Sequence, residues 1–214
     1  MIDESIKNKL SGERNPKEEI MPKVGMEPIR RAALMQATID EIGAVGNLDV
    51  TVSAIAKRAG MSSALAHHYF GGKEQIFLAA MRHILRVYGD EVRVALRAAH
   101  GPHARLEAVI RAGFSSTNFQ PEVIAAWLNF YVMAQTSAAA HRLLRVYQRR
   151  LHSNLMHELR PLIGAKAPDA AVRIAALIDG IYLRQGLARD TAGQGRATDQ
   201  VLALLEMELK GTSE

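Results

Sequence analysis

The sequence contains no cysteine, and this absence excludes disulfide bonds and zinc sites built from thiolates. No apolar run reaches the roughly 18 residues that a membrane-spanning helix needs, so we expect no membrane partner. The first stretch of the chain is polar and lacks the apolar core of a signal peptide. Together these absences favour a protein of the reducing cytoplasm.

The residue patterns of common enzyme active sites are also missing. We find no nucleophile paired with a base, no phosphate-binding loop and no paired carboxylates for acid and base catalysis. Ser115 and Ser116 follow Gly113 but do not form a G-x-S-x-G turn, and no predicted strand precedes them. His67 and His68 point about 100° apart on a helix, and no cysteine or nearby acidic residue completes a metal site. We therefore expect neither catalysis nor a metal or other cofactor.

Positive charge exceeds negative charge only slightly in this sequence. The net charge of +5 and the pI of about 9.6 favour an anionic partner weakly. Residues 22–75 hold six lysines and arginines against five acidic residues, so their bulk charge does not identify a DNA-binding segment. A case for DNA must depend on where the charges lie.

Hydrophobic residues make up 48% of the chain, which is enough to build a core. No run alternates β-branched and polar residues, whereas apolar residues recur at helical spacing, so we predict an all-α protein. Glycine and proline separate the helices. The predicted helices cover 29–45, 51–60, 62–70, 73–99, 102–117, 121–137, 139–162, 168–189 and 197–210.

Residues 51–70 predict two short helices joined by a tight turn. Thr51 or Ser53 can cap the first helix, and Ser62 or Ser63 can cap the second. A turn this tight brings the two helices close together, as in a helix-turn-helix.

Close crossing needs small residues, and Ala56 and Gly60, four positions apart, supply them. We predict that the exposed face of the second helix, including Ala66, enters the major groove of double-stranded DNA. Basic and aromatic side chains beside this helix are placed to contact phosphates. The predicted DNA-binding residues are Thr51, Lys57, Ser62, Ser63, Ala64, His67, His68, Tyr69 and Lys73.

The stretch Thr51-Val-Ser-Ala-Ile-Ala-Lys-Arg-Ala-Gly-Met-Ser62, followed by Phe70-Gly-Gly-Lys73-Glu-Gln-Ile-Phe77, resembles the signature of the TetR family of repressors. The resemblance covers residues 29–77. It implies the family fold, dimerisation through the last two helices and ligand-controlled release of a palindromic operator. Many members carry glycine or a hydroxyl residue early in the reading helix. This chain has Ala64-Leu65-Ala66 there, so base specificity is left to the serines and histidines around them.

This resemblance divides the chain into three parts. Residues 1–20 are expected to be a disordered extension because they lack apolar periodicity. Residues 21–72 form the N-terminal three-helix helix-turn-helix domain, and residues 73–214 form a C-terminal helical ligand-binding and dimerisation domain. We expect a homodimer through 168–189 and 197–210, since both helices carry wide apolar faces.

A closer similarity is to the branch of this family that responds to choline and represses genes of glycine betaine synthesis. It rests on several stretches across the chain. The resemblance implies an effector that is choline or a similar cation, and it suggests that Met21 is the usual start. The stretches are Met21-Pro-Lys-Val-Gly-Met26, Ala126-Trp-Leu-Asn-Phe-Tyr131, Arg149-Arg-Leu151 and Ala176-Leu-Ile-Asp-Gly-Ile-Tyr-Leu-Arg184.

A quaternary ammonium group donates no hydrogen bond, so its sites use aromatic faces and sometimes a carboxylate. Trp127 and Tyr131 share one helix face, while Asp179 and Tyr182 lie in an apolar run where a charge needs a partner. With Phe114, these are the predicted effector-binding residues. Core packing of the aromatic residues and a dimer-interface role for Asp179 remain open alternatives.

Other functions also remain open from sequence alone. Tyr131 and Tyr182 stand where the choline-responsive branch often has tryptophan, which leaves room for a different effector. The chain can instead repress other genes, for example those of efflux, or carry an enzyme or scaffold on the same helical fold.

Overall fold

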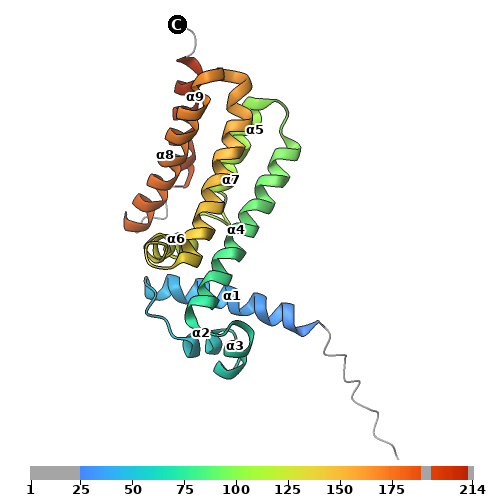
Figure 1. The fold of residues 1–214 in the computed structure, drawn as a ribbon, viewed down its shortest axis with the longest axis vertical. Helices are drawn as coiled ribbons and strands as arrows, with labels where there is room; N and C mark the ends of the chain where they lie inside the picture. The colour runs from blue at the N-terminus through green and yellow to red at the C-terminus, as the bar shows by residue number, and fades with distance from the viewer. Residues whose placement is uncertain (1–24, 189–193, 212–214) are drawn as a thin grey trace, which may run out of the picture.

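The computed structural model describes residues 25–188 and 194–211 (Figure 1). The predicted extension over residues 1–20 and the start at Met21 lie outside this range. The described residues contain no strand, in agreement with the all-α prediction. A short 3₁₀ helix at Gly164–Lys166 links two of the long helices. The α-helices are α1 (Met26–Val45), α2 (Val52–Arg58), α3 (Ser63–Phe70), α4 (Lys73–Ala98), α5 (Pro102–Gly113), α6 (Pro121–Met133), α7 (Ala138–Ile163), α8 (Ala167–Ala188) and α9 (Gln194–Lys210).

Hydroxyl caps and glycines set the ends of the first helices. The Thr51 side chain accepts a hydrogen bond from the Ala54 amide at 3.0 Å, so Thr51 caps α2. In the same way Ser62 caps α3, accepting from the Leu65 amide at 3.2 Å. Gly60 has a φ of 70°, a left-handed conformation that lets the chain turn sharply between α2 and α3.

Two predicted helices were too long, and side-chain hydrogen bonds explain why. The run predicted over 102–117 ends at Gly113, because the turns that follow are held by a hydrogen bond from the Asn118 amide to the Ser115 hydroxyl at 3.2 Å. The run predicted over 121–137 ends at Met133. Ser137 begins the next helix instead, since its hydroxyl accepts from the Ala140 amide.

The helices form a small group and a long bundle (Figure 1). Helices α1, α2 and α3 pack together with the first turns of α4, and the bundle of α4, α5, α7, α8 and α9 runs along the long axis of the molecule. Helix α6 lies across the end of this bundle, against α1. None of the described helices is long and apolar enough to cross a bilayer.

The contact between α1 and α6 is unusually close. A Cβ atom added at Gly43 in α1 would lie 2.9 Å from the Cα atom of Glu122 in α6, so only glycine fits without a shift. The Asn129 side-chain amide also reaches across from α6 and donates to the Gly46 carbonyl at 3.4 Å. The two helix groups therefore meet backbone to backbone at this point.

Candidate functional site

Helix α3 is rotated relative to the prediction. Ala66, which we expected on the exposed face, is fully buried, whereas Leu65 is only half-buried. The prediction for Ala66 was wrong because α3 packs against α2 and α4, and a methyl group is small enough for the side that faces them. The exposed face of α3 presents Ala64, His67 and His68.

The two serines predicted to read bases are already engaged within the fold. Ser62 caps α3 through its side-chain oxygen. The hydroxyls of Ser63 and Ser53 lie 2.8 Å apart, which ties α3 to α2. Each serine retains at most part of its hydrogen-bonding capacity for DNA.

The two adjacent histidines differ in their surroundings. The Nδ1 atom of His67 is hydrogen-bonded to the Gly71 carbonyl at the end of α3. A carbonyl only accepts, so Nδ1 donates a hydrogen here and Nε2 is left for another partner. The ring of His68 is exposed and packs beside Tyr69, with 5.5 Å between ring centroids. Within residues 25–188 and 194–211, neither ring nitrogen of His68 has a hydrogen-bond partner, so His68 is the histidine better placed to meet a base edge.

Positive charge lies on both sides of α3. Lys57 on α2 and Lys73 at the start of α4 are exposed, and so is Thr51, the residue that caps α2. Tyr69 is half-buried under the guanidinium of Arg31, which lies 5.4 Å from the centre of its ring. Arg31 was not among the predicted DNA-binding residues, because its distance in sequence from α3 conceals this contact.

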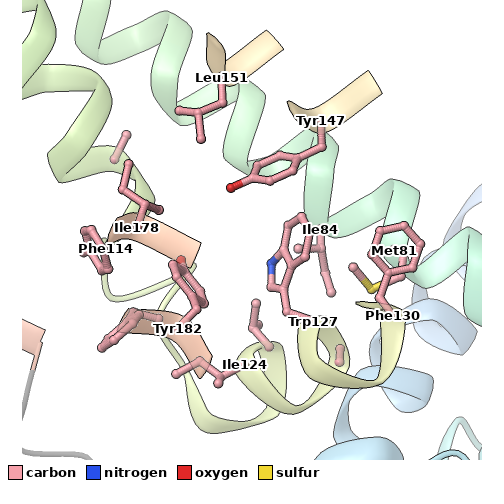
Figure 2. Close-up of a cluster of buried hydrophobic side chains, with 14 of the residues drawn as sticks. Met81, Ile84, Phe114, Ile124, Trp127, Phe130, Tyr147, Leu151, Ile178 and Tyr182 are labelled. Carbon is pink, nitrogen blue, oxygen red and sulfur yellow. The ribbon is translucent and has the colours of Figure 1, made fainter. Parts of the chain in front are cut away.

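The predicted effector residues gather in the bundle. Trp127, Tyr147 and Tyr182 point toward one another from α6, α7 and α8 (Figure 2). They line a small cavity together with Tyr88, Tyr131 and Asp179, and we call these six residues the aromatic cage. Four of the five predicted residues belong to it.

Phe114 does not line the cavity. It packs behind Tyr182, with 5.5 Å between ring centroids, and supports that ring from outside. Tyr88 and Tyr147 line the cavity and were missed. Both lie on apolar stripes of their helices, Tyr147 between Leu143 and Leu151, and these stripes indicate burial without indicating a shared cavity.

Asp179 is the one acidic residue among the described residues that line the cavity. The Tyr131 hydroxyl donates a hydrogen bond to it at 3.0 Å. Burial raises the pKa of Asp179, while hydrogen bonds from Tyr131 and Tyr147 oppose that shift. Burial and the neighbouring carboxylate raise the pKa of the four cage tyrosines, so their hydroxyls remain protonated donors.

The wall formed by Tyr182 is held by the turn that follows α5. Its hydroxyl donates to the backbone carbonyl of Gly113 and lies 3.3 Å from that of Asn118. The Asn118 side chain and the Ser115 hydroxyl both bind the carboxylate of Glu91 on α4. This polar network fixes the ring of Tyr182 against the cavity.

The cavity measures about 20 Å³. A single water needs about 10–15 Å³ on the same measure, so the cage as it stands holds about one water molecule. An organic cation enters only if one or more rings move outward. Chemically, the cage offers aromatic faces and a single carboxylate to a cation that donates no hydrogen bonds.

Comparison with known proteins gives two family matches. Residues 34–80 match the model of bacterial regulatory proteins of the tetR family, and residues 102–210 match the model of the BetI-type transcriptional repressor, C-terminal. The chain is 50% identical over 192 residues to the HTH-type transcriptional regulator BetI of Brucella abortus, covering 89% of this chain and 97% of that protein. It is 48% identical to the regulator of the same name from Agrobacterium fabrum, covering 89% and 93%.

Solved structures show the same fold. A transcriptional regulator of Pseudomonas aeruginosa PAO1 superposes with a TM-score of 0.72 at 26% identity, covering 86% of this chain and 92% of that one. A regulator from Saccharomonospora viridis, solved in complex with choline, gives 0.74 at 19% identity, covering 84% and 96%. These relatives are named as transcriptional regulators and not as enzymes. The chain therefore belongs to the TetR family of bacterial transcriptional regulators, and its C-terminal part is that of a BetI-type repressor.

Proposed function

We propose that the chain binds a palindromic operator as a homodimer and releases it when choline, or a close quaternary ammonium relative, enters the aromatic cage. The regulated genes are then those that convert choline into glycine betaine, and the protein works in the cytoplasm. The observation that carries the proposal is the meeting of five aromatic rings and one carboxylate around a single cavity. This combination suits a cation that has no hydrogen to donate.

The DNA contacts follow from the exposed face of α3. Exposed lysines lie on the helices before and after it, Lys57 on α2 and Lys73 at the start of α4, and we assign both to phosphates that flank the major groove. Ala64 offers only a methyl contact, such as one to thymine. His68 is the strongest candidate for a hydrogen bond to a base.

The dimer is supported by an apolar stripe along α8. Val172, Leu183 and Leu187 are 59%, 50% and 72% exposed in the single chain. They share one helix face with Ala176 and Gly180, and a Cβ placed at Gly180 meets no other described atom within 4 Å beyond the neighbouring backbone of its own helix. A partner helix can approach closely there. The exposed Met207 on α9 extends the surface, so a two-fold contact through both helices buries it.

A displacement caused by ligand binding can be transmitted to the DNA-binding helices through α6. This helix carries Trp127 and Tyr131 in the cage, and its residue Glu122 touches α1 at Gly43 without space to spare. Since the cage holds about one water, a trimethylammonium group must push its walls outward, and a shift of α6 presses directly on α1. The ligand favours the shifted state only if it binds that state more tightly than the DNA-bound one.

The proposal is tested by measuring choline binding by calorimetry with the free dimer and with the dimer on its operator. We expect saturable binding to the free dimer, weaker binding to the complex, and loss of the operator footprint as choline is added. Ethanolamine, whose ammonium group keeps its hydrogens, serves as the control and should bind more weakly. Failure to bind choline at millimolar concentration, or equal affinity for the free and DNA-bound dimers, would contradict the proposal.

A further inference from the structure

A second, larger hollow lies outside the aromatic cage, between α4 and α7. This groove has a volume of about 400 Å³. Four arginines line it, Arg82, Arg86 and Arg93 from α4 and Arg150 from α7, and we call it the arginine groove. Its volume falls in the range of small-molecule sites, about 300–1,000 Å³.

The positive charge of the arginine groove is largely uncompensated. No aspartate or glutamate is among the described residues that line it. Arg93 is paired with Asp90, whereas the one side-chain partner of Arg86 in the described part of the chain is the Nδ1 atom of His83, at 3.0 Å. Burial and the charge of Arg86 lower the pKa of His83, so this ring is neutral near pH 7.

Arg150 belongs to a basic stretch of α7 with Arg145 and Arg149, and all three side chains are exposed. Arg145 and Arg149 do not line the groove. Arg150, one helix turn beyond Val146, lines the groove opposite the arginines of α4. It forms no salt bridge within the described part of the chain.

The arginine groove and the aromatic cage share a wall. Tyr88 and Tyr147 line both spaces, and their rings meet edge to face with 6.2 Å between centroids. Displacement of this pair would join the two spaces into one elongated site. The joined site would have a carboxylate and aromatic faces at its inner end and arginines at its outer end.

We propose that this elongated site takes a quaternary ammonium compound that also carries a phosphate or sulfate ester. The trimethylammonium group occupies the cage, and the anionic ester lies on the arginines. The inference rests on the proposed cage and defines its ligand more narrowly. A simple cation meets repulsion in the groove, whereas a zwitterion is attracted at both ends. Arginine also matches the oxygens of a phosphate or sulfate with paired hydrogen bonds.

The test compares ligands on the full chain by calorimetry. We expect phosphocholine to bind at least about tenfold more tightly than choline. The affinity of choline sulfate then shows whether the site prefers a phosphate or a sulfate ester. Glycine betaine has a carboxylate only one carbon from its nitrogen, too near to reach the groove, and should gain nothing over choline. Inorganic phosphate alone should bind far more weakly than phosphocholine.

Two matched arginine substitutions test where the anionic ester group binds. Arg150→Gln should lower phosphocholine affinity about tenfold while leaving choline affinity within twofold. Arg149→Gln removes the same charge one residue away, outside the groove, and should leave both affinities near those of the unaltered chain.

Three results would overturn the inference: no advantage of either ester over choline, an equal gain for glycine betaine, or an equal loss in Arg149→Gln. If choline binds while the esters show no advantage, only the groove assignment fails. If neither choline nor the esters bind, the aromatic cage itself fails as an effector site.

Discussion

The surface of α3 and the aromatic cage present their functional groups in opposite ways. On α3 the groups that would meet DNA lie mostly at the surface, and several already serve the fold, as Ser62 does in capping the helix. In the cage the functional groups are large and largely buried, and their hydroxyls are held by Asp179 or by backbone carbonyls. A DNA-reading surface must be ready before its ligand arrives, whereas the cage must open to receive one.

This contrast predicts different consequences of mutation. Changes in the cage should alter ligand affinity and the packing of the bundle together, because the same rings do both. Changes on α3 should separate into those that weaken folding and those that weaken DNA binding. A cage variant that weakened DNA binding in the absence of ligand, or an α3 variant that weakened ligand binding, would show that the two sites are less distinct than their structures indicate.

The largest effect is expected from Asp179→Asn. The change keeps the size of the side chain but removes the only acidic group lining the described cavity. Loss of one partner of a desolvated charge pair costs about 2–5 kcal/mol, so the dissociation constant of choline measured by calorimetry should rise by about thirtyfold to several thousandfold. Asp169→Asn, an exposed site on the same helix, should leave choline affinity unchanged.

The pH dependence of binding follows from the same residue. Because burial raises the pKa of Asp179, the folded chain holds this proton to a higher pH than the unfolded chain does. The protonated carboxyl therefore favours folding at acid pH, and this contribution is lost as the pH rises through the raised pKa. Choline needs the ionised carboxylate, so its affinity should fall as the pH is lowered toward that pKa. Asp179→Asn should abolish this dependence, and a variant that retained it would contradict the assignment.

Trp127→Leu should have the next largest effect. It removes an aromatic wall worth about 2 kcal/mol to a desolvated cation, which corresponds to a roughly thirtyfold rise in the dissociation constant of choline. Phe130→Leu is the control, because Phe130 is fully buried beside Trp127 and does not line the cavity. Both variants should lose stability, but only Trp127→Leu should lose choline affinity. Operator affinity without ligand should stay near that of the unaltered chain in both.

Lys73→Ala tests the predicted binding of phosphates. Removing one lysine–phosphate interaction flattens the dependence of log affinity on log salt by about 0.9, so a dimer without two of them changes by about 1.8. Lys166→Ala removes the same charge on the 3₁₀ helix after α7 and should leave the salt dependence unchanged. If Lys73→Ala weakens binding to the operator but not to random DNA, the side chain reads sequence and the phosphate assignment is wrong. His68→Ala should show that selective pattern instead.

The smallest effect is expected from Ser62→Ala. Loss of a helix cap costs about 1 kcal/mol of stability, which denaturant titration can measure. Ser116→Ala, at an exposed turn position, should change stability much less. An unchanged stability combined with weaker operator binding would show that Ser62 acts on DNA rather than on its own helix.

The sequence predicted the DNA-binding helices well because their signals are local. The cap at Thr51, the turn at Gly60 and the cap at Ser62 each depend on residues within a few positions of one another. Which face of α3 is buried was harder to predict from the sequence. Leu65 and Ala66 are both apolar, and only the distance between packed helices decides which one is buried.

The cage was only partly predicted, because its residues come from helices that are far apart in the sequence. Trp127 and Tyr131 could be paired because one helix turn separates them, and Asp179 stood out as a charge in an apolar run. Tyr88 and Tyr147 come from two other helices, and nothing local links them to α6 or α8. The arginine groove was missed because its charges belong to the tertiary arrangement of α4 and α7.

Helix α4 runs without a break from the group of α1, α2 and α3 into the bundle, so in the proposed mechanism it works as a mechanical lever. Lys73 and Tyr88 are fifteen residues apart on it, which is about 22 Å at about 1.5 Å per residue. A tilt of about 5° over that length displaces the far end by about 2 Å. In the proposed two-fold dimer this displacement would occur in both subunits, against half-sites spaced at about 34 Å, so we expect a tilt of this size to move the two α3 helices out of register with the DNA.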